Sequence, residues 1–187
     1  MNPQGRFAPR IVITGGPFSG KTTLVQALGE RGYTTVPEAA ILVIQELTEQ
    51  HGLEGQAIWR ASNPEAFQGL IINKQLELEA ALDDPDPVFL DRGRLDGIAY
   101  CRIYGSAVPP ALEQACQTLP YTHVILLDTL SRYERRTQSG RTSNRERSLL
   151  IRNALRDVYT EHGLVPIEIP ELPLEGRIAA VLAALRI

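Results

Sequence analysis

The chain has 187 residues, of which 43% are hydrophobic and 22% are charged, and 19 basic against 22 acidic residues leave a net charge of −3. These values are typical of a soluble globular protein, and the length predicts a single domain, 1–187, with little room for a second module. No apolar stretch is long enough to cross a bilayer, and the overall charge gives no sign of a nucleic-acid partner. We therefore expect any anion-binding site to be local, with no membrane span and no nucleic acid bound.

The cysteines and the first residues indicate the compartment. Cys101 and Cys116 are too far apart for a C-x-x-C metal or redox motif, and two cysteines in a chain of this length do not make a disulfide framework. We expect both to be reduced and buried. The first residues contain no apolar segment of the kind that a secretory signal needs, so the expected location is cytoplasmic.

The first predicted strand, 11–14, leads into the segment TGGPFSGKTTL, and the spacing from Gly15 to Thr22 fits G-x-x-x-x-G-K-[ST]. Between a strand and a helix this pattern is typical of a phosphate-binding loop; the alternative is an ordinary turn. Glycines let backbone N–H groups approach a polyphosphate, a lysine adds a positive charge, and a threonine hydroxyl can ligate Mg²⁺. The predicted nucleotide contacts are Gly15, Gly16, Pro17, Phe18, Ser19, Gly20, Lys21, Thr22 and Thr23.

The remaining elements alternate between helical patterns and apolar runs, which predicts an α/β fold with a buried parallel sheet. The further strands are expected at 33–36, 88–90, 124–127 and 165–169. The helices are expected at 22–31, 39–50, 64–82, 143–162 and 173–185. Gly32 suits the left-handed end of the first helix, and Asn63 suits the N-cap of the third. The least regular stretches, 51–62 and 129–142, are expected to be mobile loops.

Glu38 lies just past the second predicted strand, in the segment VPEAA. One hypothesis is that Glu38 is a general base, which accepts the proton of a hydroxyl that attacks the γ-phosphate of a nucleotide. The other is that it is a first-turn acid that stabilises the following helix through the helix dipole. The sequence leaves both open.

Asp91 directly follows the third predicted strand, at the edge of the sheet where ligands bind. It can hold Mg²⁺ through water, with Thr22 as the second residue of the metal site. Asp128 follows the next strand in the same way and is the alternative. We favour Asp91, because Arg92 and Asp96 extend its polar cluster and put a phosphate-pairing arginine beside the metal site.

Six arginines and no lysine lie between residues 131 and 147: Arg132, Arg135, Arg136, Arg141, Arg145 and Arg147. Guanidinium groups pair bidentately with phosphate oxygens and stay charged when water is expelled. The segment at about 129–147 is therefore predicted to be a flexible lid, with Arg136 and Arg141 as the candidates for contacting the transferred phosphoryl group. For any single arginine, a solvated face is the alternative.

In these motifs the chain resembles the small AAA-domain ATP-binding proteins that are similar to the nicotinamide riboside kinase domain of the NadR regulator. The resemblance spans nearly the whole chain. Its residues are Ile13 to Pro17 and on to Thr23, Tyr33, Val36 to Ala40, Phe89 to Gly93, Asp96, Tyr100, Cys101, Arg141 to Ser143, Tyr159, Ile169, Pro170 and Glu175 to Arg177. Phe18 departs from the pattern, because the subgroup usually has a small residue there.

The resemblance implies a three-layer P-loop NTPase fold, with a five-stranded parallel sheet in the kinase-like order 2-3-1-4-5, helices on both faces and an arginine-rich lid. More distantly, Asp91 and Arg92 resemble the Asp-Arg pair of thymidylate kinases, and Glu38 takes the place of the basic glutamate of deoxynucleoside kinases. These similarities imply phosphoryl transfer, with Lys21, Glu38, Asp91 and Arg92 in the active site.

Two functions are therefore compatible with the sequence. The first is a Mg²⁺-dependent kinase that uses ATP to phosphorylate a hydroxyl of a small, nucleoside-like acceptor. The second is a nucleotide-gated module that grips a protein or lipid partner when ATP or GTP orders the lid. A guanine-reading motif is missing, since the near match Asn73-Lys74-Gln75-Leu76 lacks its aspartate, and this favours ATP over GTP. Closure of an arginine-rich lid over the phosphates favours the kinase, because it excludes water.

Overall fold

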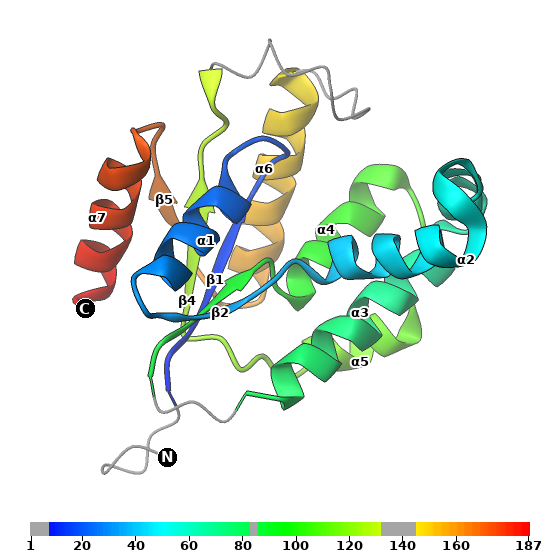
Figure 1. The fold of residues 1–187 in the computed structure, drawn as a ribbon, viewed down its shortest axis with the longest axis horizontal. Helices are drawn as coiled ribbons and strands as arrows, with labels where there is room; N and C mark the ends of the chain where they lie inside the picture. The colour runs from blue at the N-terminus through cyan, green and yellow to red at the C-terminus, as the bar shows by residue number, and fades with distance from the viewer. Residues whose placement is uncertain (1–7, 83–85, 132–144) are drawn as a thin grey trace.

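The computed structural model describes residues 8–82, 86–131 and 145–187 (Figure 1). Its strands are β1 (Arg10–Gly15), β2 (Thr34–Val36), β3 (Val88–Asp91), β4 (His123–Leu127) and β5 (Ile167–Ile169). Its helices are α1 (Lys21–Glu30), α2 (Ala39–Ser62), α3 (Pro64–Ala80), α4 (Arg94–Tyr104), α5 (Pro110–Cys116), α6 (Arg145–Glu161) and α7 (Leu174–Leu185).

The five strands form one parallel sheet in the order β2-β3-β1-β4-β5, as predicted. In the register of the sheet, Ile13 of β1 pairs with Asp91 of β3, and Gly15 pairs with Leu127 of β4. Because the strands are parallel, the segments that follow β1, β3 and β4 all leave the sheet at the same edge. This edge brings the glycine-rich loop and Asp91 together.

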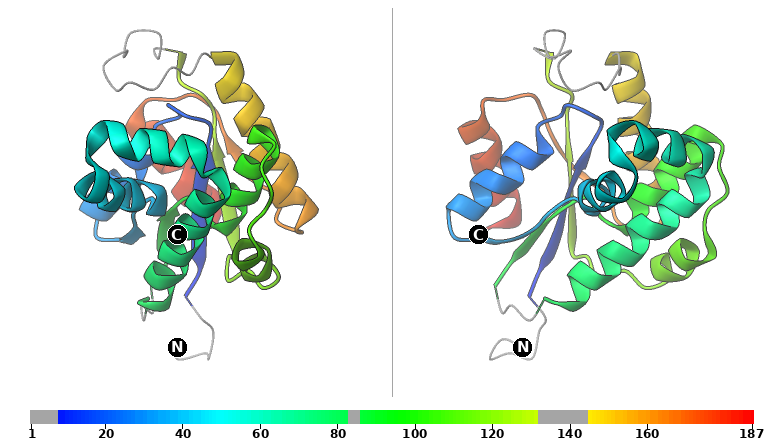
Figure 2. Two further views of the ribbon diagram at one scale, coloured as in Figure 1. Left: turned by 90° about the vertical axis from the view of Figure 1, so that its right-hand side faces the viewer. Right: turned by 45° about the vertical axis from the view of Figure 1, so that its right-hand side comes forward.

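Helices cover both faces of the sheet (Figure 2), and the central strands β3, β1 and β4 are buried, with alternate residues in different cores. Ile11, Ile13 and Phe89 pack with residues of α1 and α7 on one face. Val12 and Leu90 pack on the opposite face with residues of α4, α5 and α6. The near-continuous apolar runs in the sequence follow from this, because a parallel strand covered by helices on both faces has no polar side.

The helices differ from the prediction in two regions. Residues 51–62 are not a loop but the second half of α2, which continues to Ser62 across a kink at Gly52. The segment 93–117 contains α4 and α5, for which no helices were predicted. Asn63 occupies the N-cap position of α3 without a capping bond, and its Nδ2 donates instead to the Trp59 carbonyl at the end of α2 (2.9 Å).

The structure confirms the predictions for Gly32 and for the two cysteines, but it does not describe most of the predicted lid. Gly32 follows α1 with a φ of 91°, the left-handed conformation expected there, and both cysteines are free and buried. None of the helices in the described parts of the chain is long and apolar enough to span a membrane. Most of the predicted lid lies outside the described residues, including Arg132, Arg135, Arg136, Arg141 and the expected helix start at Ser143.

The kink in α2 provides a test of the fold. Gly52 has φ 73° and ψ 172°, a region that essentially only glycine adopts, whereas Gly69 lies inside α3, and neither has other atoms within 4 Å of the place of a Cβ. Gly52→Ala should therefore destabilise the protein by about 1–3 kcal/mol through backbone strain alone. Gly69→Ala should stabilise it by roughly 0.5–1 kcal/mol. Urea unfolding measures both, and equal effects would show that α2 is not kinked at Gly52.

Candidate active site

The loop between β1 and α1 curls around the side chain of Lys21. Gly20, at the N-cap of α1, has a φ of 76°, which glycine adopts without strain. Lys21 is buried, and its Nζ donates to the Gly16 carbonyl (3.0 Å) and to Ser19 Oγ (3.4 Å). The first turn of α1 therefore starts with its N–H groups beside a buried ammonium group, an arrangement that suits an anion.

The charge of Lys21 is only partly compensated. Burial, followed by the positive charge of Arg92, lowers the pKa of the Lys21 ammonium to about 7. A polyphosphate bound in the loop would supply the missing negative charge and raise that pKa again. The loop therefore holds a cation in a place where an anion is needed to stabilise it.

Helix α6, distant in sequence, supports the outside of the loop. Ser148 of α6 donates from its Oγ to the Pro17 carbonyl (2.7 Å), and a Cβ at Gly16 would overlap the Ser148 carbonyl oxygen. Phe18 has a φ of 62°, which is uncommon for an aromatic residue. Such a conformation persists only where surrounding contacts fix the backbone, so we regard the shape of the loop as imposed by its neighbours.

Thr22 and Asp91 meet beside the loop. Thr22 Oγ1 donates to Asp91 Oδ2 (2.7 Å), and the Asp91 side chain is buried. Its other oxygen, Oδ1, is also buried and has no hydrogen-bond partner among the described residues. Burial, and then the negative charge of Glu38, raise the pKa of the Asp91 carboxyl. A cation would satisfy the free oxygen and stabilise the ionised carboxylate, so these residues fit a metal ion.

Thr22 and Asp91 fit a Mg²⁺ ion that the protein and a bound ligand would coordinate together. In the described parts of the chain, no group of three or more His, Cys, Asp or Glu residues could hold a metal ion. Mg²⁺ typically takes one or two protein ligands and completes its shell with water and substrate phosphates. Thr22 and Asp91 match that pattern.

Asp128, the alternative to Asp91, has a different environment. Its Oδ1 pairs with Arg152 Nε of α6 (2.7 Å), and Arg152 also pairs with Glu168 of β5 (2.6 Å). Asp128 therefore joins β4 to α6 and β5. Of the two strand-end aspartates, Asp91 is the one that contacts the start of α1.

Glu38, Arg92 and Asp96 form a buried chain of charges. Arg92 Nε lies 3.1 Å from Glu38 Oε1, and Arg92 Nη1 lies 2.9 Å from Asp96 Oδ1. The guanidinium also lies over the ring of Tyr100, 5.3 Å from its centroid. Glu38 occupies the N-cap position of α2, but its side chain makes no capping hydrogen bond. Its carboxylate is thus directed to Arg92.

Asp96 is fully engaged by other groups. Its two oxygens accept hydrogen bonds from Arg92 Nη1, Thr14 Oγ1 (2.7 Å), Tyr159 Oη (2.7 Å) and the Gly93 N–H (3.2 Å). A carboxylate with four donors has little capacity left for a ligand. We therefore assign Asp96 to positioning Arg92, and not to the metal site.

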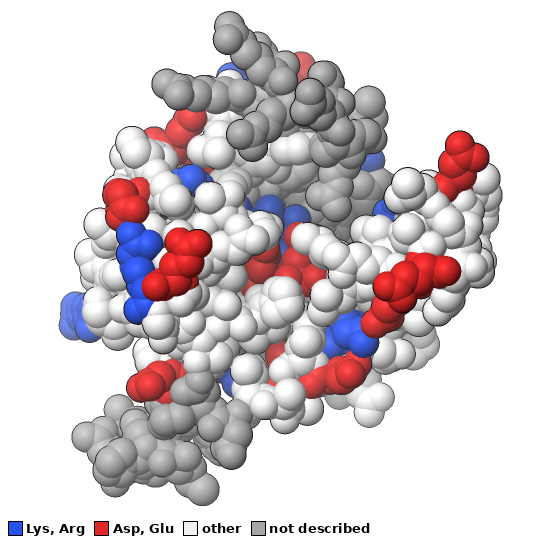
Figure 3. Space-filling model, in the orientation of Figure 1, with Lys and Arg blue, Asp and Glu red and all other residues white. Residues whose placement is uncertain are grey.

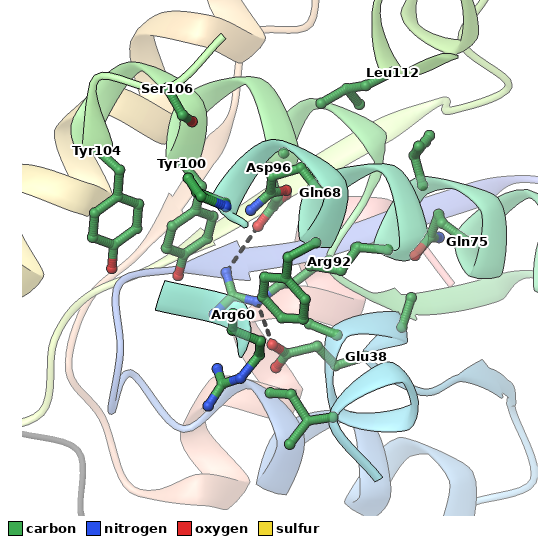
Figure 4. Close-up of a pocket in the computed structure, with 18 of the residues that line it drawn as sticks. Glu38, Arg60, Gln68, Gln75, Arg92, Asp96, Tyr100, Tyr104, Ser106 and Leu112 are labelled. Carbon is green, nitrogen blue, oxygen red and sulfur yellow. Dashed lines mark hydrogen bonds and ion pairs between the residues drawn. The ribbon is translucent and has the colours of Figure 1, made fainter. Parts of the chain in front are cut away.

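A pocket of about 720 Å³ opens next to these charges (Figure 4). This volume is within the range of small-molecule sites, roughly 300–1,000 Å³. Pro17 of the loop, Glu38 and Arg92 line one side of the pocket, whereas Phe18 is not part of its wall. Charged side chains of both signs gather in the hollow at the centre of this face (Figure 3).

Helices α2, α3 and α4 form most of the wall. Its apolar members include Ile44, Phe67, Ile71, Ile72 and Leu112, and its polar members include Arg60, Gln68, Gln75, Tyr100, Tyr104, Ser106 and Arg147. Residues 57–61, which the sequence suggested were part of a loop, contribute Ala57, Arg60 and Ala61. A mainly apolar wall with a few polar groups is what a small organic molecule requires.

Several contacts at the site could not be found by spacing in the sequence. Ser148 carries no motif, and Tyr159 and Arg177 belong to the segments of the family resemblance without a predicted role. Arg177 of α7 donates from Nη1 to the Ser19 carbonyl (3.0 Å), and Tyr159 of α6 donates to Asp96. Arg177 and Ser19 are 158 residues apart in the sequence, and Tyr159 and Asp96 are 63 residues apart, so only the tertiary fold brings each pair together.

Solved structures of similar fold are phosphotransferases by name. Thymidylate kinase from Ehrlichia chaffeensis matches with a TM-score of 0.66 and 14% identity, over 96% of this chain and 100% of that chain. Deoxyadenosine kinase from M. mycoides matches with a TM-score of 0.63 and 15% identity, over 95% and 98%. Thymidylate kinase from Candida albicans gives 0.61 and 15%, over 96% and 93%. A search of curated proteins found no match.

The family comparison covers most of the chain. A family model described as an AAA domain matches residues 10–177, which include every strand and the phosphate loop. The sheet order β2-β3-β1-β4-β5 and the similar structures show the P-loop kinase fold. The chain therefore belongs to the AAA-domain family and has the fold of P-loop kinases.

Proposed function

We propose that the protein is a Mg²⁺-dependent kinase, which transfers the γ-phosphate of ATP to a hydroxyl of a small, nucleoside-like molecule. The observation that carries this proposal is the position of the pocket: Pro17 of the phosphate loop, Glu38 and Arg92 line it together. A molecule in this pocket would lie beside the phosphates and within reach of a carboxylate. The kinases of similar fold act, by name, on a nucleoside or a nucleotide, which supports the acceptor class.

The loop between β1 and α1 would bind the nucleotide. The backbone N–H groups from Gly15 to Thr23 would surround the phosphates, and Lys21 would neutralise part of their charge. Thr22 and Asp91 would hold Mg²⁺, which, when bound, offsets the negative charge of the phosphates. Arg136 and Arg141 stay candidates for contacting the transferred group, as expected from the sequence.

Glu38 would act on the acceptor. In the transfer, the acceptor oxygen forms a bond to the γ-phosphorus, the bond from that phosphorus to the β-phosphate oxygen breaks, and ADP leaves. The proton of the acceptor hydroxyl goes to Glu38. Arg92, held by Asp96, would fix the direction of the Glu38 carboxylate. A nucleotide-gated module has no need of such a pocket, so its presence favours transfer.

A screen of acceptors tests the proposal. The purified protein would be incubated with MgATP and single nucleosides or nucleotides, and ADP release would be compared with the rate without an acceptor. We expect at least one compound to raise that rate. If ATP binds but no nucleoside-like compound raises ADP release, the proposed acceptor class is wrong.

Lys21→Met and Thr22→Ala should each weaken MgATP binding by about tenfold or more, because each removes a group that contacts a charged ligand. The methionine keeps the volume of the lysine stem, so the fold should persist. Calorimetry measures the affinity, and thermal unfolding checks the fold. Lys74→Met is the control, since Lys74 pairs with Glu46 and Glu77 in α2 and α3. Equal affinities in all variants would refute the phosphate loop.

Asp91→Asn should raise the Mg²⁺ concentration needed for half-maximal turnover by about 10–100-fold, as expected for a residue that supports a metal ion. Asp128→Asn is the matched control, because it makes the same change at the end of β4, the next strand along the chain. Its partner Arg152 keeps Glu168, so the fold should persist. Magnesium titrations of turnover compare the two variants. The reverse order of effects would place the metal at β4.

Glu38→Gln should lower kcat by roughly 10² to 10⁴, because an amide keeps the shape of the side chain but accepts no proton. The affinity for ATP should stay close to that of the wild type. Glu46→Gln, on the exposed side of α2, is the control. Single-turnover transfer and nucleotide affinity are the measurements. A wild-type transfer rate in Glu38→Gln would leave Glu38 with only the helix-stabilising role.

A further inference from the structure

Arg177 is a buried arginine that forms no ion pair with any carboxylate of the described residues. It lies in the first turn of α7 and is 6% exposed. The ion pairs among the described residues do not include it, and its Nε is buried without a hydrogen-bond partner. Burial lowers the pKa of its guanidinium, and the negative charge of Glu171 offsets this effect only in part. A buried charge that forms no ion pair costs stability, so this position is not explained by packing alone.

Arg177 donates a hydrogen bond to the phosphate loop, and this bond fixes the direction of the peptide between Ser19 and Gly20. Its Nη1 donates to the Ser19 carbonyl (3.0 Å). The peptide between Ser19 and Gly20 is trans and planar, so the Gly20 N–H points opposite to that carbonyl. Because the carbonyl faces α7, the N–H faces away from α7. Gly20 donates no backbone hydrogen bond within the described parts of the chain.

The guanidinium also lies directly against Gly20. A Cβ at this residue would be 2.6 Å from Arg177 Nη1, and the φ of 76° already disfavours a side chain. The outer side of the loop is therefore closed by Arg177. The Gly20 N–H is left available on the opposite side, at the start of α1, where an anion is expected.

We propose that Arg177 is a positioning residue of the nucleotide site: it holds the Ser19 carbonyl outward, so that the Gly20 N–H stays aimed at the bound phosphates. The inference rests on the proposed nucleotide binding. An N–H that is already aligned before binding loses no orientational freedom when the phosphate arrives, which increases affinity. The charge of Arg177, which forms no ion pair with a described residue, adds to the attraction for a polyphosphate.

The test compares Arg177→Met and Arg177→Lys with Arg31→Met. Arg31 at the end of α1 pairs with Glu175 of α7 (2.6 Å), so it joins the same two helices without touching the loop. Calorimetry would measure the affinity for MgADP and for inorganic tripolyphosphate, which has phosphates but no nucleoside. The amide signal of Gly20 in ¹⁵N-labelled protein would report the direction of its N–H on binding.

We expect Arg177→Met to weaken the binding of both ligands by about tenfold, as for the loss of one charge-assisted contact, and to reduce the shift of the Gly20 amide. Arg177→Lys, which keeps a charged donor, should recover part of the affinity, and should keep the test possible if the methionine variant does not fold. Arg31→Met should bind both ligands like the wild type.

Four results would overturn the inference or its basis. Wild-type affinity for tripolyphosphate in a folded Arg177 variant would show that Arg177 does not act on the phosphate cradle. Weaker ADP binding with unchanged tripolyphosphate binding would place Arg177 at the nucleoside instead. If Lys21→Met lowers both affinities and Arg177→Met does not, only the inference fails. If the wild type binds neither ligand, the proposed function fails.

Discussion

The carboxylate of Asp96 is the interaction on which the geometry of the site depends. It lies in the first turn of α4 and accepts hydrogen bonds from β1, from the segment after β3 and from α6. Through Arg92 it also determines where the Glu38 carboxylate lies. Buried charges are tolerated when they are paired and hydrogen-bonded, and the Asp96 carboxylate meets that condition. Four elements are thereby fixed around one side of the pocket.

The charges of the site differ between its two halves. On the pocket side, the single guanidinium of Arg92 is paired with two carboxylates. On the loop side, the ammonium of Lys21 contacts a carbonyl and a hydroxyl, the guanidinium of Arg177 contacts a carbonyl, and Asp91 adds one carboxylate beside Thr22. A region without an excess of cations does not favour a polyanion, whereas two cations beside one carboxylate do. This difference agrees with a polyphosphate in the loop and a small acceptor in the pocket.

The kinked helix α2 gives the pocket its far wall. Residues 53–62 continue the helix beyond Gly52 and supply Ala57, Arg60 and Ala61 to the wall, which α3 then extends. Arg60 lies over the Phe67 ring, 5.3 Å from its centroid, and so joins the two helices at the pocket. Without the kink, α2 would continue straight and would not return to α3. The position of this wall thus depends on one glycine conformation.

The sequence alone determined the features that depend on local pattern. The apolar runs indicate the strands, because a parallel strand covered on both faces needs consecutive apolar residues, and the spacing from Gly15 to Thr22 indicates the loop, because consecutive residues form it. The second half of α2 was not predicted, since Gly52 and the polar residues around it are typical of a loop, whereas in the structure this part of the chain packs against α3. The helices α4 and α5 were not predicted either. The choice of Asp91 rested on neighbouring residues, but its buried free oxygen and its contact with Thr22 came from strand register. Only the tertiary structure decided that Asp96 is saturated by Thr14 and Tyr159 and that Arg177 lies against Gly20, because these contacts join residues 63 to 158 positions apart.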